Sequence, residues 1–473
     1  MSERGTSFFD TVIDRTLNNL RSAWRDVAES ARNVIGAPVR PELSGDDTER
    51  LRERMRNCLE GRGGEVSSRA RAADLGHTYL ALNATGRERF LRLLAEGFDV
   101  DRAAVDSTAA RLAGASGAER LRAERALRQA LEAPRVRLLT QFNGLPEGVK
   151  FLVDMRAELM ALSRDDVVLA GLEQDLKALL AHWFDIGFLE LRRITWEAPA
   201  ALLEKLIVYE AVHEIRGWTD LKNRLEADRR CFAFFHPRMP DEPLIFVEVA
   251  LTRGIADSIH PLLDESAPLG DPMGADTAIF YSISNCQKGL AGISFGNFLI
   301  KRVVDSLAAE LPRLKAFATL SPSPGFRNWL DELLAAGENG VLSVAEQRAI
   351  DALPNGSGAS GLRQLLGSPG WHESEPIMRA LRAPLLRLCA RFLMLEKTAA
   401  GRARDPVAHF HLSNGARLER LNWAADLSPK GLQQSAGIMM NYLYRLSEIE
   451  SNHEAYTAEG MIAASTAIRT LIR

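Results

Sequence analysis

AIFYSISNCQKGLAGISFGNFLIKRVVDSLAAELPRLKAFATLSPSPGFRNW, the stretch Ala278–Trp329, contains the pattern around which the chain is organised. An apolar run from Ala278 to Ile283 precedes a loop that carries glycines 289, 292 and 296. The loop opens onto an amphipathic segment, and a second apolar run, Lys315–Leu320, ends in a Ser-Pro-Ser-Pro-Gly turn. The pattern predicts a strand, a glycine loop, a helix and a second strand.

The glycine loop is a candidate phosphate-binding site. Backbone amides at a helix N-terminus face the preceding loop, and glycines let an anion approach them closely. A connecting loop whose glycines only serve turn geometry is the alternative, and a loose glycine cluster does not decide between the two.

The composition is that of an ordinary globular protein. The chain has 473 residues, 46% of them hydrophobic and 26% charged, which is enough for two or three domains. A formal net charge of −3 gives no indication of a nucleic-acid partner. The four cysteines are scattered and form no CxxC pair, which fits a reducing compartment.

Neither a membrane span nor a targeting segment is apparent in the sequence. No apolar run approaches the roughly 20 residues that a membrane helix requires. The first residues include acidic side chains and lack the apolar core of a signal peptide, and Leu471-Ile472-Arg473 is not a peroxisomal signal. We therefore expect a cytoplasmic protein without a membrane partner.

The fold class predicted from these patterns is α+β, with an all-α N-terminal bundle followed by an α/β domain. Residues 1–184 show helical periodicity and no β-type alternation, beginning with the apolar positions from Phe9 to Trp24. We expect residues 1–184 to form a helical domain, either structural or for oligomerisation, and residues 185–473 to form a second domain that carries the candidate site residues. Further helices are expected at 48–59, 69–81, 86–96, 101–112, 118–131, 145–162 and 169–184.

The second part of the chain combines strands and helices. Two apolar runs, 231–235 and 244–251, are separated by a turn-rich connection and predict a β-hairpin. The helix between the apolar runs 278–284 and 315–321 predicts a crossover and hence a parallel strand pair. Residues 405–412 are expected to be strand or loop. Ser428-Pro429 predicts the start of a helix through Leu446, and a last helix is expected from 457 to 472.

Ser294 is a candidate nucleophile because Gly292–Gly296 matches the GxSxG pattern of hydrolases. That motif requires its serine at the end of a strand, whereas here the apolar run stops about ten residues earlier. The alternative is a loop serine that lines the anion site.

His409 and His411 are separated by one residue, and on a strand both side chains would face the same way, as in HxH metal pairs. No third ligand with convincing spacing is nearby. His411 is also a candidate acid, base or oxyanion donor, since it precedes a polar Ser-Asn-Gly turn. A structural histidine is the alternative in either case.

Ser321 ends a predicted strand, and Pro322, Pro324 and Gly325 fix the backbone after it. Its hydroxyl is therefore expected at the carboxyl edge of the sheet, where α/β proteins place their sites. A plain turn serine is the alternative.

These segments together resemble the malonyl-CoA decarboxylase family. The resemblance covers most of residues 185–460 and, more weakly, the helical part. It rests on four long motifs: FYSISNCQKGLAGISFGNFLIKRVV (280–304), ATLSPSPGF (318–326), DPVAHFHLSNGARLERLNWAADLSPKG (405–431) and GIMMNYLY (437–444). It implies a catalytic domain similar to the GCN5-related N-acetyltransferase fold, in which a loop and a helix N-terminus hold the CoA pyrophosphate. It also implies a homotetramer, a dimer of dimers, assembled by the helical domain.

The resemblance assigns roles to individual positions. The family's catalytic serine falls on Ser321 and its catalytic histidine on His411. Its substrate loop falls on Ala291, Gly292, Ile293, Ser294, Phe295, Gly296 and Asn297. His409 lies outside the FHLxNGA pattern and receives no role. Animal members of the family have organelle-targeting segments, so this chain resembles a bacterial member.

The expected reaction converts malonyl-CoA to acetyl-CoA and CO₂. Loss of CO₂ places negative charge on the thioester oxygen, where His411, Asn414 or a loop amide could donate a hydrogen bond. The enolate then takes a proton on carbon. We expect Ser321 and His411 to lie within hydrogen-bond reach of one another, and we expect the chemistry to need neither a metal nor a cofactor.

Three other classes remain open from the sequence. An acyl-CoA-dependent acyltransferase would use the same CoA site together with an acceptor. A serine hydrolase would depend on Ser294 and release free CoA. A non-catalytic helical scaffold would turn over nothing.

Overall fold

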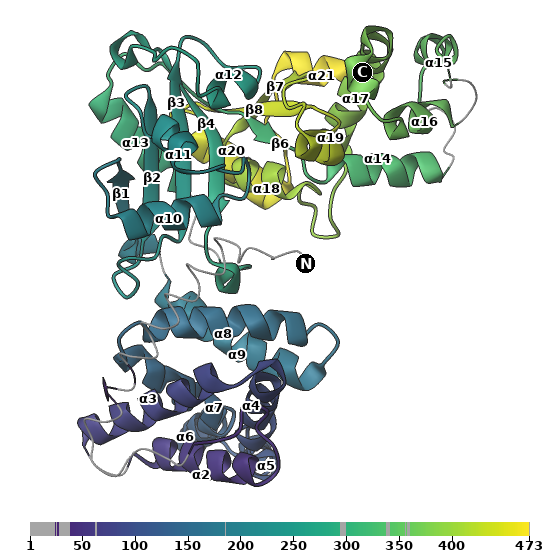
Figure 1. Ribbon diagram of the computed structural model, residues 1–473. Coiled ribbons are helices and arrows are strands. Elements are labelled where there is room, and N and C mark those ends of the chain that lie inside the picture. Colours follow the sequence, from purple (N-terminus) through teal and green to yellow (C-terminus); the bar gives the residue numbers. More distant parts are fainter. Residues whose placement is uncertain are drawn as a thin grey trace, which may run out of the picture. The chain divides into compact units, whose positions relative to one another are not determined.

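The computed structural model describes residues 24, 26–27, 38–61, 64–184, 186–293, 299–336, 341–354, 356 and 360–472 (Figure 1). The chain divides into two compact units. The helical unit comprises residues 1–190, 235–244 and 285–295, and the sheet unit comprises residues 191–234, 245–284 and 296–473. Two short segments from the second part of the sequence, 235–244 and 285–295, are therefore grouped with the N-terminal helices.

The helical unit is built on an aromatic core. Trp24 packs edge-on against Phe151 at a centroid distance of 4.7 Å, and Tyr79 packs against Phe90 at 5.0 Å. All four side chains are at most 2% exposed. The helices are α2 (Asp46–Glu60), α3 (Glu65–Ala81), α4 (Ala84–Gly97), α5 (Arg102–Gly114), α6 (Gly117–Ala130), α7 (Pro134–Gln141), α8 (Gly148–Leu162) and α9 (Val167–Trp183).

Capping residues explain where several of these helices begin. The side chains of Asn83, Asp101 and Asp166 accept hydrogen bonds from the first-turn amides of α4, α5 and α9. The seven helices predicted from residue 48 onward are present within a few residues of their expected bounds, whereas α7 was missed. Except for Trp24, the segment expected to be helical between Phe9 and Trp24 lies outside the described residues.

Within the described residues, eight strands form one mixed sheet in the order β1-β2-β3-β4-β5-β8-β6, with β7 pairing to β8 (Figure 1). The predicted hairpin is present as the antiparallel pair β2–β3, and the predicted crossover as the parallel pair β4–β5. The strands are β1 (Glu190–Ile194), β2 (Arg229–Phe235), β3 (Ile245–Thr252), β4 (Thr277–Asn285), β5 (Ala316–Thr319), β6 (Ser321–Pro322), β7 (Arg417–Asn422) and β8 (Met439–Tyr444).

The α-helices of the sheet unit connect and flank these strands. They are α10 (Ala200–Tyr209), α11 (Trp218–Arg224), α12 (His260–Leu263), α13 (Leu299–Glu310), α14 (Phe326–Ala335), α15 (Val344–Asp351), α16 (Gly361–Gly367), α17 (Glu375–Leu395), α18 (Pro406–Ser413), α19 (Pro429–Ser435), α20 (Ile449–Glu459) and α21 (Thr466–Leu471). A buried cluster at the centre of the sheet includes Ala250, Ile279, Ala318 and Met439 from four different strands.

Three predictions for the last seventy residues were wrong. Residues 405–412 are not strand or loop but lie almost entirely in helix α18, because Asp405 caps it and Pro406 occupies its first turn. Ser428 does cap a helix, but that helix ends at Ser435 and the chain continues as strand β8. The single C-terminal helix expected over 457–472 is two helices, α20 and α21. Strands β1 and β7 were not predicted.

Candidate active site

Ser321 and His411 are in direct contact. The Ser321 Oγ lies 3.1 Å from His411 Nε2, as expected from the sequence, and both residues are buried, with 6% and 2% of their surface exposed. Ser321 begins β6, directly beside β8, and His411 lies in the last turn of α18. The structure thus brings the two residues together across 90 positions of sequence. Their catalytic roles remain predictions.

The pair is part of a longer chain of hydrogen bonds. Ser321 Oγ donates to Thr319 Oγ1 at 2.9 Å, and His411 Nδ1 lies 2.8 Å from the Tyr444 hydroxyl. If Tyr444 donates to Nδ1, the imidazole hydrogen is on Nε2 and is donated to Ser321, whose own hydrogen goes to Thr319. This single tautomer satisfies all three contacts at once.

The imidazole of His411 is neutral at physiological pH. Burial lowers the pKa of His411 to about 3, because the charged form would lose its hydration without gaining a carboxylate partner. Burial also raises the pKa of Tyr444, so its phenol keeps its proton. A buried, uncharged imidazole between two hydroxyl groups can donate one proton and accept another without acquiring a net charge.

Strand β8 supplies the walls around the imidazole. Tyr442 and Tyr444 are two residues apart on β8, so their side chains project from the same face of the strand. The Tyr442 ring stacks on His411 at a centroid distance of 4.7 Å and an interplanar angle of 26°. The ring plane of His411 is therefore fixed by stacking, and its rotation within that plane by the Tyr444 hydroxyl.

Strand β5 is joined to β8 at the position next to Ser321. The backbone amide of Tyr442 donates to Thr319 Oγ1 at 3.1 Å, and Asn441 Nδ2 donates to the Thr319 carbonyl at 2.7 Å. Both Thr319 and Asn441 are fully buried. These bonds tie the strand end that precedes Ser321 to the strand that carries the two tyrosines.

Asp405 connects the two segments that carry the pair, helix α18 with His411 and the turn that follows Ser321. Its Oδ1 accepts hydrogen bonds from the amides of Val407 and Ala408, at the start of α18. Its Oδ2 accepts from Ser323 Oγ at 2.8 Å and from the Gly325 amide at 3.2 Å, in the turn after Ser321. One carboxylate, 1% exposed, thus holds the His411 helix against the Ser321 turn. Burial raises the pKa of Asp405 despite these four donors.

His409 does not join His411, which corrects the interpretation of the two residues as a same-side pair. On a helix, residues two apart point to nearly opposite sides. His409 Nδ1 contacts the hydroxyl of Tyr456 on α20 at 2.8 Å, whereas His411 faces β8. Among the described residues, no group of three or more His, Cys, Asp or Glu side chains is arranged to hold a metal ion.

The predicted substrate loop is described only in part. Ala291, Gly292 and Ile293 belong to the helical unit and follow the short 3₁₀-helix Lys288–Leu290. Ser294, Phe295, Gly296 and Asn297 lie outside the described residues. Gly292 has φ of +71°, a conformation that favours glycine.

Asn414 lies at the C-cap of α18, three residues after His411, and is 5% exposed. Its Nδ2 donates to the Phe410 carbonyl at 2.8 Å. This bond holds the Asn414 side chain against its own helix.

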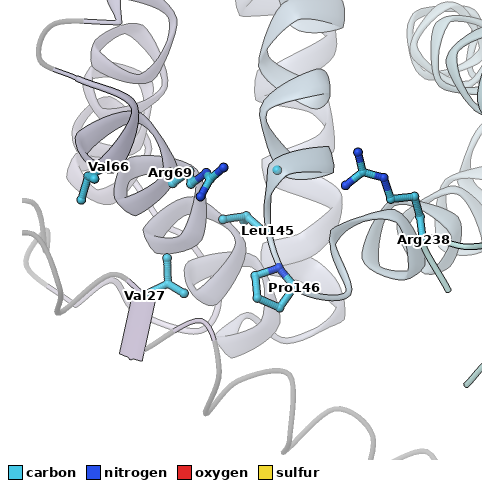
Figure 2. Close-up of a pocket in the computed structure, with 7 residues that line it drawn as sticks. Val27, Val66, Arg69, Leu145, Pro146 and Arg238 are labelled. Atoms are coloured by element: carbon cyan, nitrogen blue, oxygen red, sulfur yellow. The ribbon is translucent and has the colours of Figure 1, made fainter. Parts of the chain in front are cut away.

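A separate cavity of about 500 Å³ lies in the helical unit (Figure 2). It is lined by Val27, Val66, Arg69, Gly144, Leu145, Pro146 and Arg238. Figure 2 shows Arg69 and Arg238 on either side of Leu145 and Pro146. None of the predicted site residues lines this cavity.

Sequence reasoning missed Tyr444, Tyr442, Thr319 and Asp405. The signal for Asp405 was present, since Asp-Pro is the same cap and first-turn combination that was recognised at Ser428-Pro429. Tyr444 is 33 residues from His411, and nothing local marks it as its partner.

Comparisons with known proteins agree with the motifs. The model of the malonyl-CoA decarboxylase C-terminal domain matches residues 187–473, and that of the N-terminal domain matches residues 98–184. A protein of Anser anser anser named malonyl-CoA decarboxylase, mitochondrial, is 41% identical over 420 residues, covering 85% of this chain and 83% of that protein. The Mus musculus protein of the same name is 41% identical over 406 residues, covering 82% of each.

Solved structures show the same fold. Malonyl-CoA decarboxylase from Rhodopseudomonas palustris superposes with a TM-score of 0.82 at 43% identity, covering 89% of this chain and 99% of that one. The enzyme from Agrobacterium vitis gives a TM-score of 0.81 at 44% identity, with the same coverage. Family models that span most of the chain, and relatives above 40% identity over four fifths of it, show that the chain belongs to the malonyl-CoA decarboxylase family.

Proposed function

We propose that this chain, a carboxy-lyase by family, converts malonyl-CoA to acetyl-CoA and CO₂ at the Ser321–His411 pair. The observation that carries the proposal is the 3.1 Å contact between Ser321 Oγ and His411 Nε2, inside a buried and uncharged hydrogen-bond chain. A neutral chain of this kind fits a reaction that must release a carboxylate as CO₂ rather than stabilise its charge.

The bond that breaks joins the carboxylate carbon to the α-carbon of the malonyl group. Its electron pair moves into conjugation with the thioester, and the negative charge develops on the thioester oxygen. A neutral N–H or O–H donor can stabilise that oxygen without attracting the carboxylate strongly. The enolate then takes one proton on the α-carbon, which completes acetyl-CoA.

The proton that reaches carbon comes from the pair in this proposal. Ser321 lies beside the Nε2–H of His411, so the imidazole can stabilise the serine oxygen while the hydroxyl proton moves to carbon, and one proton per turnover returns to the pair from solvent. Tyr444 is placed to stabilise the Nε2–H tautomer from the other side. Asn414 and the loop residues Ala291–Asn297 are proposed to bind the acyl-CoA, with the loop holding its phosphates.

The proposal also covers features that the family resemblance implies. We expect a homotetramer assembled through the helical domain of residues 1–184, a catalytic domain of residues 185–473 with a fold similar to GCN5-related N-acetyltransferases, and a cytoplasmic location. The chemistry needs no cofactor beyond the CoA of the substrate, so turnover should survive a chelator. In the described part of the chain, no helix is long and apolar enough to cross a membrane.

The test is incubation of the purified protein with malonyl-CoA alone. Acetyl-CoA as the product, with no acceptor present, is the expected result. Free CoA as the main product would indicate a hydrolase, and turnover only after an acceptor is added would indicate an acyltransferase. Either of those results would overturn the proposal.

A further inference from the structure

The described part of the substrate loop is anchored to helices α8 and α9 by one buried arginine. Arg156 Nη1 donates to the Gly289 carbonyl at 2.5 Å, and Nη2 donates to the Ala291 carbonyl at 3.0 Å. Glu173 on α9 accepts from Nε and Nη2 of the same guanidinium at 2.9 and 2.7 Å. The Arg156 side chain is 2% exposed, so its orientation is fixed by these four bonds.

Gly289 lets the loop approach helix α8 this closely. A Cβ atom at residue 289 would lie 1.7 Å from the carbonyl oxygen of Val153, inside the van der Waals contact of the helix backbone. The loop therefore rests on α8 through backbone contact, and Arg156 binds the two carbonyls on either side of Leu290.

This anchor brings Gly292 next to Lys177 of α9. The Lys177 Nζ lies 3.3 Å, and its Cε 3.6 Å, from the point that a Cβ on Gly292 would occupy. Lys177 lies one turn after Glu173 on the same helix and is partly exposed. Within the described residues, the Lys177 ammonium forms no hydrogen bond and no ion pair.

We propose that Lys177, a residue of the helical part of the chain, binds a phosphate of CoA at the substrate loop. An ammonium group is a common phosphate ligand and acts as a point charge. Gly292 has no side chain that would lie against Nζ, since a Cβ there would be 3.3 Å from it. This inference rests on the proposed function, because it assumes that the loop receives an acyl-CoA.

The test compares substrates with and without phosphates. Lys177→Gln removes the charge and keeps most of the side-chain volume. We expect KM for malonyl-CoA to rise about tenfold, since a charge-assisted hydrogen bond is lost, while kcat stays near that of the wild type. For malonyl-pantetheine, which has no phosphate, KM should be the same in both proteins. Lys177→Arg should recover most of the affinity for malonyl-CoA.

The controls separate this inference from a general loss of structure. Lys222→Gln removes an exposed lysine on α11 and should leave both KM values unchanged. An unchanged KM for malonyl-CoA in Lys177→Gln, or an equal rise for malonyl-CoA and malonyl-pantetheine, would overturn the inference. If the wild-type protein did not decarboxylate malonyl-CoA, calorimetric titration with CoA and with pantetheine would still test Lys177: weaker binding of CoA alone supports it.

Discussion

The surroundings of Ser321 and those of Gly292 are built from opposite chemistry. Ser321 contacts an imidazole whose pKa is lowered to about 3 and a threonine hydroxyl, and no charged side chain contacts either residue of the pair within the described structure. Gly292 lies beside the ammonium group of Lys177, and the carbonyl of the preceding residue, Ala291, accepts a hydrogen bond from Arg156. The uncharged region suits a step that expels CO₂, and the cationic region suits the phosphates of CoA. In the proposed function, chemistry and binding therefore rest on separate groups, which different mutations should disturb separately.

The largest effect is expected from the uncharged region. His411→Ala or Ser321→Ala should lower kcat by about 10²- to 10⁴-fold, because each removes a group that acts where charge and proton move. The affinity for CoA should change little. Steady-state kinetics and calorimetric titration with CoA measure the two quantities.

His409→Ala and Ser294→Ala are the matched controls for these two substitutions. His409 is on the same helix as His411 but contacts Tyr456, so its loss should leave most of the turnover. Ser294 belongs to the predicted loop, and at saturating substrate its loss should also leave most of kcat. Abolished turnover in Ser294→Ala, with turnover kept in Ser321→Ala, would reverse the assignment and favour the hydrolase.

The next effect is expected at the charged region. Gly292→Asp should weaken CoA binding on the order of 10- to 100-fold, because it adds a negative charge beside the proposed phosphate site and a side chain where φ is +71°. Calorimetry with CoA measures the affinity, and kcat at saturating substrate should be affected less.

Gly254→Asp controls for backbone strain in the Gly292 experiment. Gly254 has a similar φ of +74°, and no atom lies within 4 Å of the position that its Cβ would take. This variant should bind CoA like the wild type. Equal affinity for CoA in a folded Gly292→Asp protein would exclude the loop as the phosphate site.

A smaller effect is expected from Asp405, which contacts neither Ser321 nor His411 but joins helix α18 to the turn that follows Ser321. Asp405→Ala removes the cap of α18 and the acceptor for Ser323, so the free energy of unfolding should fall by about 2 kcal/mol. kcat should fall about tenfold, because the distance between serine and histidine is no longer fixed. Ser428→Ala also removes a helix cap, on α19, and should lower stability without lowering kcat. Equal kcat values in the two variants would contradict the positioning role.

The smallest effect concerns pH. The pKa of His411 is about 3 in the folded chain against 6.5 when unperturbed. As the pH falls, the unfolded chain therefore takes up a proton on His411 before the folded chain does. Between pH 6.5 and 3 this residue should reduce the free energy of unfolding by roughly 1 kcal/mol per pH unit. The stability difference between wild type and His411→Gln, measured by urea titration, should therefore shrink from pH 7 to pH 5. Glu248, whose pKa is raised to about 8, has the opposite dependence and cancels, since both proteins retain it.

The parts of the fold that could be predicted are those with a local signal. The β2–β3 hairpin has two apolar runs around a Pro-rich turn. The β4–α13–β5 unit has two strand-like apolar runs, with a glycine loop and a segment of helical periodicity between them. Strand β8 was missed because its apolar run, following a good helix cap at Ser428, is equally compatible with a continued helix. Residues 405–412 also fit more than one type of element, so α18 was not predicted, and His409 and His411 were expected on the same face of a strand.

The site was predictable only as far as the family motifs extend. Ser321 and His411 were identified by the resemblance, and they meet because β6 pairs with β8 while His411 of α18 packs against the tyrosines of β8. A single sequence carries no signal for contacts between distant segments. The contacts of Tyr444 and Thr319, and the hydrogen bond that Asp405 accepts from Ser323, are contacts of this kind. The same is true of Arg156, which lies more than 130 residues before the loop that it holds.

The central claim is that Ser321 and His411 act as one unit, and a double-mutant cycle on kcat tests it most directly. The cycle compares wild type, Ser321→Ala, His411→Ala and the double mutant at saturating malonyl-CoA. We predict that the double mutant is little slower than the slower single mutant, because either substitution alone already breaks the unit. A double mutant whose loss in kcat equals the product of the two single losses would contradict the account, since the two side chains would then contribute independently.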